Sequence, residues 1–347
     1  MRIIAEAPCR VDLAGGTLDI WPLYLFHPGA VTVNFAINLL TRCAIETLDS
    51  PEIRLHSSDL KATESYRSLA DLDAARRPRL PLAACLLRFF RPSSGLAVQT
   101  DSESPAGAGI AGSSALMIAA ASALNRFTGA GYHREKIREI AQNVEAQIIR
   151  VPTGVQDYYP ALYGGVSAIE LGAAGVRRVA ISVDLDDFNQ RIVLCYTGAP
   201  RNSGINNWEV TKAYINGDRK VQRNFGHIAS IASSMRAAVE KADWSEAGRL
   251  LREDWSHRRG NVPGISTPAI DRLITLARRA GSLGAKVCGA GGGGCVFFLV
   301  QHGARQRVAQ VIANAGARIL PVQVAARGVT IRAGGVTIGK DRKGFKK

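Results

Sequence analysis

The sequence predicts an α+β fold built in two halves. Partly alternating, β-branched runs at residues 3–13 and 30–48 indicate strands, whereas segments with helical spacing dominate after residue 205. A chain of 347 residues is long enough to bury two cores. Because the pattern changes near residues 175–190, we place a boundary there. The predicted parts are an N-terminal domain at 1–185, a C-terminal domain at 186–335 and a basic tail at 336–347.

The elements follow in order along the chain. After the first strands, the first half is expected to contain a helix at 80–90, a strand at 96–100, helices at 114–128 and 133–150, and a strand at 166–171. Gly129 ends the helix at 114–128, and Pro152 ends the helix at 133–150. The second half is expected to contain strands at 191–197, 295–300 and 319–324, and helices at 206–216, 221–241, 244–258, 267–280 and 305–314.

Composition indicates an ordinary globular protein, with 46% hydrophobic and 21% charged residues. No run of about 18 apolar residues predicts a membrane span. The N-terminus lacks the apolar core of a signal peptide and reads as a strand. The six cysteines are scattered without a Cys-x-x-Cys pair, which favours reduced thiols, a cytoplasmic location and no zinc site.

The formal net charge of +15 raises the question of an anionic partner. Nucleic acid and a small anionic substrate are both compatible with such a charge. The arginines are spread along the chain, and the basic tract lies at the very end, in residues 340–347. We therefore expect no nucleic-acid partner and no membrane partner, and the charge leaves two interpretations: a small anionic substrate, such as a nucleotide or a sugar phosphate, or an arginine-rich surface that only solvates the protein.

A glycine-rich segment at residues 104–116 runs directly into an alanine-rich helix. Ser113 and Ser114 lie where that helix should begin. A glycine loop at a helix N-terminus presents unpaired N–H groups and a positive dipole end to an anion. The segment is therefore either a phosphate-binding turn or a surface loop capped by serine, and on its own it leaves both open.

Three further segments carry candidate chemistry. Residues 289–294 hold more glycine than a turn between helix and strand needs, which favours a close backbone approach. Glu145 and Asp157 flank a Pro-Thr-Gly turn, and phosphoryl transfer needs a metal-holding carboxylate and a group that orients or deprotonates a hydroxyl. Arg10 and Asp19 lie on either side of a Gly-Gly turn that follows the first strand, where they could contact a phosphoryl group and sugar hydroxyls.

The order of these segments resembles the GHMP kinases, the superfamily of galactokinase, homoserine kinase, mevalonate kinase and phosphomevalonate kinase. The resemblance spans residues 3–325. It implies a two-domain fold with an N-terminal mixed β-sheet covered by helices and a C-terminal ferredoxin-like α/β sandwich. The Gly-x-x-x-x-Gly-Lys-Ser/Thr pattern of ordinary P-loop proteins is absent.

The resemblance also implies a role for individual residues, with ATP and Mg²⁺ as cofactors. Asp157 would act as base towards the substrate hydroxyl, with Arg10 beside the transferred phosphoryl group, and Ser113 and Glu145 would hold the metal. The ATP phosphates would be cradled by Pro105, Gly107, Ala108, Gly109, Ile110, Ala111, Gly112, Ser113 and Ser114. The substrate would be bound by Asp19, Gly16, Thr197, Arg201, Gly291 and Gly292.

Two departures from the family pattern matter. The phosphate loop usually reads Gly-Leu-Gly-Ser-Ser-Ala, but here Ala111 stands for a glycine and Gly112 for the first serine. If Ala111 takes a positive φ, the loop is strained. The galactokinase signature Gly-Glu-His-x-Asp is also missing, and residues 15–19 read Gly-Gly-Thr-Leu-Asp instead.

With Gly-Gly-Thr-Leu-Asp at residues 15–19, the sequence resembles the branch of the superfamily that contains D-glycero-D-manno-heptose 7-phosphate kinase and fucokinase. The resemblance implies that the anomeric hydroxyl of a sugar is phosphorylated. The sequence is therefore expected to encode an ATP-dependent sugar kinase, as a monomer or homodimer, for a heptose 7-phosphate or a related sugar. Two alternatives remain: a kinase for another small alcohol, such as galactose, fucose or a mevalonate-like acid, or a non-catalytic sugar and nucleotide sensor.

Overall fold

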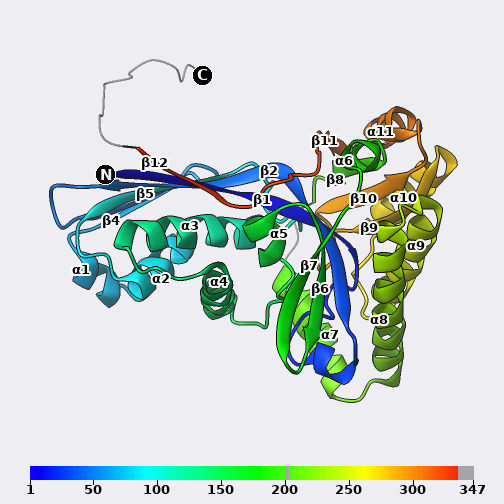
Figure 1. The fold of residues 1–347 in the computed structure, drawn as a ribbon, viewed down its shortest axis with the longest axis horizontal. Coiled ribbons are helices and arrows are strands. Elements are labelled where there is room, and N and C mark those ends of the chain that lie inside the picture. Colours follow the sequence, from blue (N-terminus) through cyan, green and yellow to red (C-terminus); the bar gives the residue numbers. More distant parts are fainter. Residues whose placement is uncertain (200–202, 335–347) are drawn as a thin grey trace.

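The computed structural model describes residues 1–199 and 203–334, except for the side chains of residues 203–206. Arg201 and the predicted tail at 336–347 lie outside the described residues. The fold is α+β, with one mixed and one antiparallel sheet, which confirms the predicted fold class (Figure 1).

Within the described residues, the first sheet has eight strands. Its main path is β12-β1-β2-β5-β3-β4, and the β6–β7 hairpin extends it from β2. The sheet is mixed because β3 and β5 run parallel while its other pairs are antiparallel. The strands are β1 (Arg2–Ala14), β2 (Val31–Thr47), β3 (Ile53–Ser57), β4 (Ala62–Tyr66), β5 (Leu96–Ser102), β6 (Val166–Gly172), β7 (Gly175–Ile181) and β12 (Thr330–Gly334).

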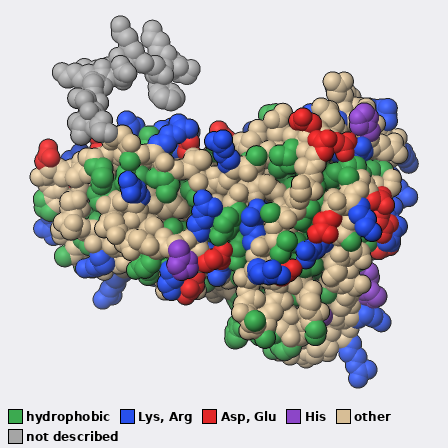
Figure 2. Space-filling view, viewed as in Figure 1, with side chains coloured by type: hydrophobic (Ala, Val, Ile, Leu, Met, Phe, Trp, Pro, Cys, Tyr) green, Lys and Arg blue, Asp and Glu red, His purple; other side chains and the backbone are tan. Residues whose placement is uncertain are grey.

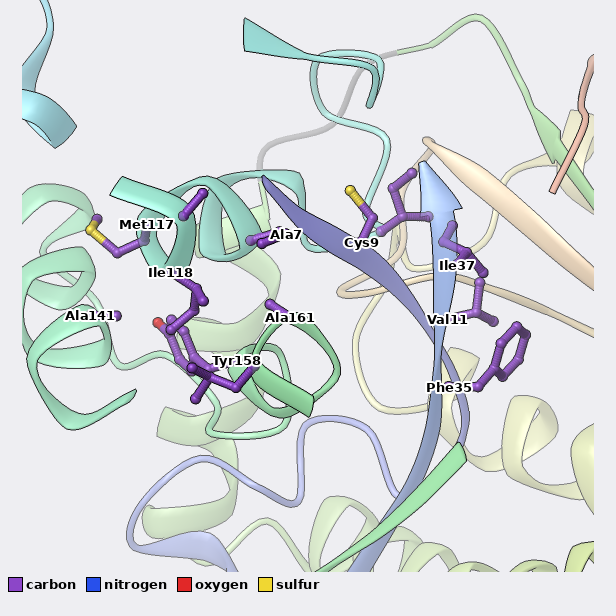
Figure 3. Close-up of a cluster of buried hydrophobic side chains, with 14 of the residues drawn as sticks. Ala7, Cys9, Val11, Phe35, Ile37, Met117, Ile118, Ala141, Tyr158 and Ala161 are labelled. Atoms are coloured by element: carbon purple, nitrogen blue, oxygen red, sulfur yellow. The ribbon is translucent and has the colours of Figure 1, made fainter. Parts of the chain in front are cut away.

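One face of this sheet is covered by α3, which packs on β1 and β2. The helix is buried along much of its length because alanines let it approach the strands closely. Figure 3 shows Met117 and Ile118 of α3 beside Tyr158 and Ala161 of α5. The elements of this half are η1 (Leu23–Phe26), α1 (Leu69–Ala74), α2 (Pro81–Phe90), α3 (Gly112–Thr128), α4 (Arg134–Ile149), α5 (Tyr158–Tyr163) and α6 (Leu185–Asn189).

The second sheet, in the part of the chain that the structure describes, has four antiparallel strands in the order β11-β8-β10-β9. Helices α9 and α10 pack on β9, and α11 packs on β8 and β11. Its strands are β8 (Ile192–Tyr196), β9 (Ser282–Val287), β10 (Cys295–Val300) and β11 (Arg318–Leu320). The helices are α7 (Ser203–Ile215), α8 (Arg219–Glu240), α9 (Trp244–Arg259), α10 (Pro268–Arg279) and α11 (Arg305–Asn314).

The last described strand returns to the first sheet. β12 pairs antiparallel with β1, and Val324 bridges to Ile37 of β2. Residues assigned to the second half of the chain thus complete the sheet of the first half. The boundary near residue 185 stays a prediction, since the sheets share chain across it.

Charged side chains are mixed on the surface. Figure 2 shows Lys and Arg side chains scattered over one face with Asp and Glu among them, rather than gathered in a stripe. In the described ranges, no helix combines the length and the apolar character needed to span a bilayer.

Candidate active site

A cavity of about 770 Å³ lies where the two halves meet. Its wall includes the glycine-rich segment, the start of α3, the end of α4 and the turn before α5. The second half contributes Asn207, Arg258, Gly289 and Ala290. Every segment with candidate chemistry therefore reaches the same cavity.

The glycine-rich segment forms a left-handed turn before α3. Gly107 and Gly109 have φ values of 66° and 78°, and Ala111 takes 58°. Ala111 is the residue before the helix, and none of the described side chains caps it. The first N–H groups of α3 therefore face the cavity wall without a side-chain acceptor, which is the geometry of an anion site. The strain anticipated for Ala111 is present.

Backbone hydrogen bonds hold this loop from both sides. Arg10 of β1 donates its N–H to Ile110 O at 2.9 Å and its Nη1 to Gly109 O at 2.8 Å. On the other side, Cys295 N donates to Ala108 O at 2.7 Å. A Cβ on Gly294 would lie 2.6 Å from Ala108 O, so only glycine permits this approach. The second glycine-rich segment thus supports the first.

Arg10 also pairs with Asp157. Its Nε and Nη2 lie 2.9 and 2.6 Å from Asp157 Oδ1. The Arg10 side chain is only 4% exposed, while that of Asp157 is 23% exposed towards the cavity that both line. Burial alone would lower the pKa of Arg10, but Asp157 and Asp12 together raise it above its usual range. The arginine is therefore a fixed cation beside a reachable carboxylate.

Glu145 lies at the end of α4 and turns towards the start of α3. Its Oε1 accepts a hydrogen bond from Ser113 Oγ at 2.6 Å, and its Oε2 accepts from Ser114 Oγ at 2.8 Å and Tyr158 Oη at 2.6 Å. Burial raises the pKa of Glu145 despite these donors. A carboxylate and a hydroxyl side by side on a cavity wall are oxygen ligands of the kind Mg²⁺ prefers. No cluster of three acidic, His or Cys side chains occurs in the described residues, so phosphate and water oxygens would complete such a site.

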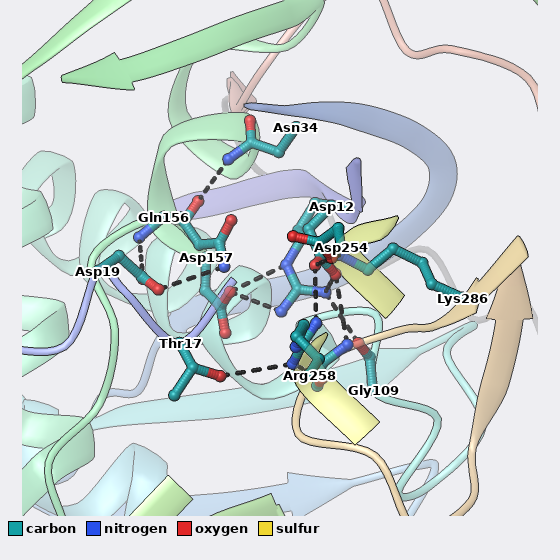
Figure 4. A network of polar contacts seen from close by, with 12 residues as sticks. Asp12, Thr17, Asp19, Asn34, Gly109, Gln156, Asp157, Asp254, Arg258 and Lys286 are labelled. Atoms are coloured by element: carbon teal, nitrogen blue, oxygen red, sulfur yellow. Dashed lines mark hydrogen bonds and ion pairs between the residues drawn. The ribbon is translucent and has the colours of Figure 1, made fainter. Parts of the chain in front are cut away.

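Asp19 lies deeper in the cavity, at 2% exposure. Its carboxylate accepts from Gln156 N at 2.9 Å and Gln156 Nε2 at 3.3 Å. A Cβ on Gly154 would lie 2.0 Å from Asp19 Oδ2, so glycine is needed in the turn before Asp157. Burial, with a contribution from nearby Asp157, raises the pKa of Asp19 to about 7. Figure 4 shows Asp19 hydrogen-bonded to Gln156, the residue that precedes Asp157 in the chain.

A buried ionic cluster joins the two halves, and two of its members, Asp12 and Arg258, line the cavity (Figure 4). Lys286 of β9 is fully buried, and its Nζ lies 2.8 Å from Asp12 Oδ2 and 2.6 Å from Asp254 Oδ2. Arg258 Nη1 lies 3.2 Å from Asp12 Oδ2. Burial alone would raise the pKa of Asp12, but Lys286, Arg258 and Arg10 hold it below its usual range.

The same two carboxylates fix the glycine turns. Asp12, from the first half, accepts from Gly289 N at 3.4 Å, and Asp254, from the second half, accepts from Gly15 N at 3.1 Å. Arg258 adds a bond from Nη2 to Gly289 O at 2.5 Å. We call Asp12, Asp254, Arg258 and Lys286 the ionic clasp. It holds Arg10 and the second glycine-rich segment in fixed positions.

The structure brings most predicted site residues together. The residues that line the cavity are Arg10, Asp19, Pro105, Gly107, Ala108, Gly109, Ala111, Gly112, Ser113, Ser114, Glu145 and Asp157. Ile110 does not line the cavity, because its side chain is fully buried in the core. Its carbonyl oxygen nevertheless accepts a hydrogen bond from Arg10 N.

Four other predicted residues also lie off the cavity wall in the described part of the chain. Gly16 packs on Asp12 and Arg258. Thr197 bonds Gly294 O through its N–H and hydroxyl, each at 2.9 Å. Gly291 and Gly292 pack on the backbone of Ile265. Arg201 lies outside the described residues.

Sequence reasoning missed the ionic clasp, although one signal was present. Lys286 is a charged residue in a strand with no other charge, whereas Asp12 lies in β1, which also carries Glu6 and Arg10 on the same alternating face. Asp254 and Arg258 gave no such signal, because charged residues are common on exposed helix faces.

Models of the GHMP kinases N terminal domain and the GHMP kinases C terminal region match residues 80–165 and 235–318. This chain belongs to the GHMP kinases. It is thus a phosphotransferase that acts on an alcohol group. The match covers the phosphate loop, Glu145 and Asp157 in the first half, and α9, β9 and β10 in the second.

Several named GHMP kinases are similar to it at low identity. It is 25% identical over 309 residues to D-glycero-alpha-D-manno-heptose 7-phosphate kinase of Campylobacter jejuni, covering 86% of this chain and 89% of that protein. It is 26% identical over 359 residues to mevalonate kinase of Thermococcus onnurineus, covering 95% and 98%.

A third relative is much longer. The chain is 26% identical over 328 residues to the L-fucokinase/L-fucose-1-P guanylyltransferase of Bacteroides fragilis, covering 85% of this chain but only 34% of that protein. Among solved structures, a D-glycero-D-manno-heptose 1-phosphate kinase from Bacteriodes thetaiotaomicron superposes with a TM-score of 0.78 at 22% identity, covering 96% of this chain and all of that one. This likeness concerns the fold.

Proposed function

We propose that this GHMP kinase transfers the γ-phosphoryl group of ATP to the anomeric hydroxyl of a sugar, such as a heptose 7-phosphate. One arrangement carries the proposal. The Arg10–Asp157 pair and the Ser113–Glu145 pair line one cavity, on either side of an uncapped helix N-terminus. Phosphoryl transfer needs these parts: an anion cradle, oxygen ligands for a metal, and a base for the acceptor hydroxyl.

Each residue has a defined task in this proposal. The loop at 105–114 holds the phosphates by backbone N–H groups, and Ser113 and Glu145 hold Mg²⁺. Bound MgATP supplies the γ-phosphoryl group, whose bond to ADP breaks as its bond to the sugar oxygen forms. Asp157 orients the hydroxyl and accepts its proton. Arg10 holds the Asp157 carboxylate in place and offsets negative charge next to it.

Asp19 favours a sugar over a mevalonate-like acid. Its carboxylate lines the cavity beside Asp157 and can accept hydrogen bonds from neutral hydroxyl groups. The same group would repel a substrate carboxylate when ionised. The relatives that act on heptose phosphates and fucose support the same choice, whereas the mevalonate kinase relative supports the alternative.

The test is a kinase panel that measures ADP release with D-glycero-D-manno-heptose 7-phosphate, L-fucose, D-galactose and mevalonate. The expected result is turnover of one of the sugars, with the new phosphate at the anomeric carbon by ³¹P NMR. Turnover of mevalonate alone would overturn the sugar assignment. ATP and sugar binding by calorimetry without ADP release from any acceptor would indicate a sensor instead.

A further inference from the structure

The space beside the first residue of α3 is filled by a side chain from another segment. A Cβ built on Gly112 would lie 2.7 Å from Ser104 Oγ and 2.8 Å from Ser104 Cβ. Both distances are shorter than real Cβ contacts, so residue 112 can carry a side chain only if Ser104 moves. The Ser104 hydroxyl thus occupies the position that a side chain at 112 would take.

This hydroxyl is placed to meet a ligand. Ser104 is half-buried and lines the cavity together with Gly112 and Ser113. Its Oγ donates a long 3.3 Å bond to the adjacent Pro105 O and also makes a hydrogen bond with the Cys9 thiol, and a carbonyl at this distance and a thiol are both weak partners. Its backbone is fixed, because Ser104 N donates to Ser102 Oγ at 3.2 Å. A hydroxyl with a weak local acceptor can exchange that acceptor for a charged one at little cost.

We propose that Ser104 is a phosphate-binding residue. It supplies, from the end of β5, the hydroxyl that Gly112 lacks at the start of α3, and it donates a hydrogen bond to a phosphate oxygen of the bound nucleotide. Ser104 and Gly112 form a matched pair, since only one of the two positions has room for a side chain. This inference rests on the proposed role of residues 105–114 as the ATP cradle.

The pair can be tested by a double-mutant cycle. Ser104→Ala, Ser104→Gly, Gly112→Ser and the double variant Ser104→Gly/Gly112→Ser, which removes both colliding atoms of Ser104, are compared with the unchanged chain by titration calorimetry with ATP and with adenosine. Ser104→Ala should weaken ATP binding by about tenfold, as expected for a lost hydrogen bond to a charged group, and leave adenosine binding unchanged. A purely structural serine would affect both ligands alike.

The double variant decides whether the two positions share one space. Gly112→Ser alone should weaken ATP binding and lower Tm, because the new side chain collides with Ser104. In the double variant the collision is gone and a hydroxyl is back at the helix start, so ATP affinity should return to within about threefold of the unchanged chain.

The outcomes separate this inference from the proposed function. If the unchanged chain binds ATP and Ser104→Ala binds it equally well, the role of Ser104 is overturned and the kinase assignment stands. If the double variant loses ATP affinity by the product of the losses in the two single variants, the two positions act independently and the matched pair is overturned. If the unchanged chain does not bind ATP, the proposed function fails, and the Ser104 role fails with it.

Discussion

Both hydrogen bonds from Arg10 to Asp157 end on one carboxylate oxygen, Oδ1, at 2.9 Å from Nε and 2.6 Å from Nη2. The guanidinium therefore fixes the carboxylate through one oxygen. The other, Oδ2, accepts neither of these bonds, and in the proposed reaction we assign it to the substrate hydroxyl. Arg10 also donates to Gly109 O, so one side chain sets the spacing between Asp157 and the loop that precedes α3.

Asp157→Asn should lower kcat by at least about 100-fold, because an amide cannot accept the hydroxyl proton and a general base contributes roughly 10²–10⁴-fold. ATP affinity should stay within about threefold, since the amide oxygen can still accept from Arg10. Steady-state ADP release and calorimetry measure the two effects. A kcat within about tenfold of the unchanged chain would contradict the assignment of the base.

Glu145→Gln should raise the Mg²⁺ concentration needed for half-maximal turnover by about tenfold or more, because a neutral amide is a poorer ligand for a hard cation. ATP binding in EDTA should change little. The measurement is a Mg²⁺ titration at saturating ATP, paired with calorimetry in EDTA. An unshifted titration would remove Glu145 from the metal site.

Asp19 should make stability depend on pH. Its pKa is about 7 in the folded chain, against an ordinary value of about 3.9. The folded state holds the proton more tightly, so this contribution to stability is complete below about pH 4 and is lost as pH rises to about 7. Asp19→Asn cannot ionise and should show a flatter profile. Urea midpoints at pH 5, 6, 7 and 8 test this, and parallel profiles would refute it.

Ala111→Gly should raise the free energy of unfolding by about 0.5–1 kcal/mol, because glycine accepts a φ of 58° without the steric cost that alanine carries. The matched control is Ala237→Gly, at an exposed position in α8, which should lower it by about 1 kcal/mol. Denaturant titration measures both. Loss of stability in both variants would mean that the loop holds no strain at Ala111.

Lys286→Met should lower the free energy of unfolding by about 3–5 kcal/mol, because Asp12 and Asp254 would be left buried without their shared cation. Adding Asp254→Asn should recover part of the loss. Lys136→Met, which removes an exposed ion pair to Glu139, is the control and should cost at most about 1 kcal/mol. Equal losses in the two single variants would argue against an ionic clasp.

The predicted site residues that the structure brings to one cavity lie in short local motifs. The phosphate loop, Glu145 and Asp157 are each surrounded by glycine, proline or serine in patterns whose backbone geometry is set over a few residues. Their meeting in one cavity could be expected only from the order of the motifs. The strain at Ala111 was also foreseeable, because its neighbours already indicated a left-handed turn.

Long-range packing explains what the sequence did not reveal. Gly291 and Gly292 were expected at the substrate; the structure shows that the missing side chain of Gly291 allows close contact with Ile265 and that Gly292 N donates to Ile265 O, and a sequence does not distinguish such packing from substrate contact. Five strands were missed. They are short or partly polar: β3, β4, β7, β9 and β12. Two of them, β3 and β12, also pair with strands far along the chain, β5 and β1.

The pairing of β12 with β1 has a consequence for synthesis. β1 emerges from the ribosome first, yet the neighbour on its outer edge is the last strand described. Until that strand is made, the edge of β1 is an open template for other chains. The second sheet is translated in the interval, so the nascent protein must shield an unfinished first sheet while it completes the rest.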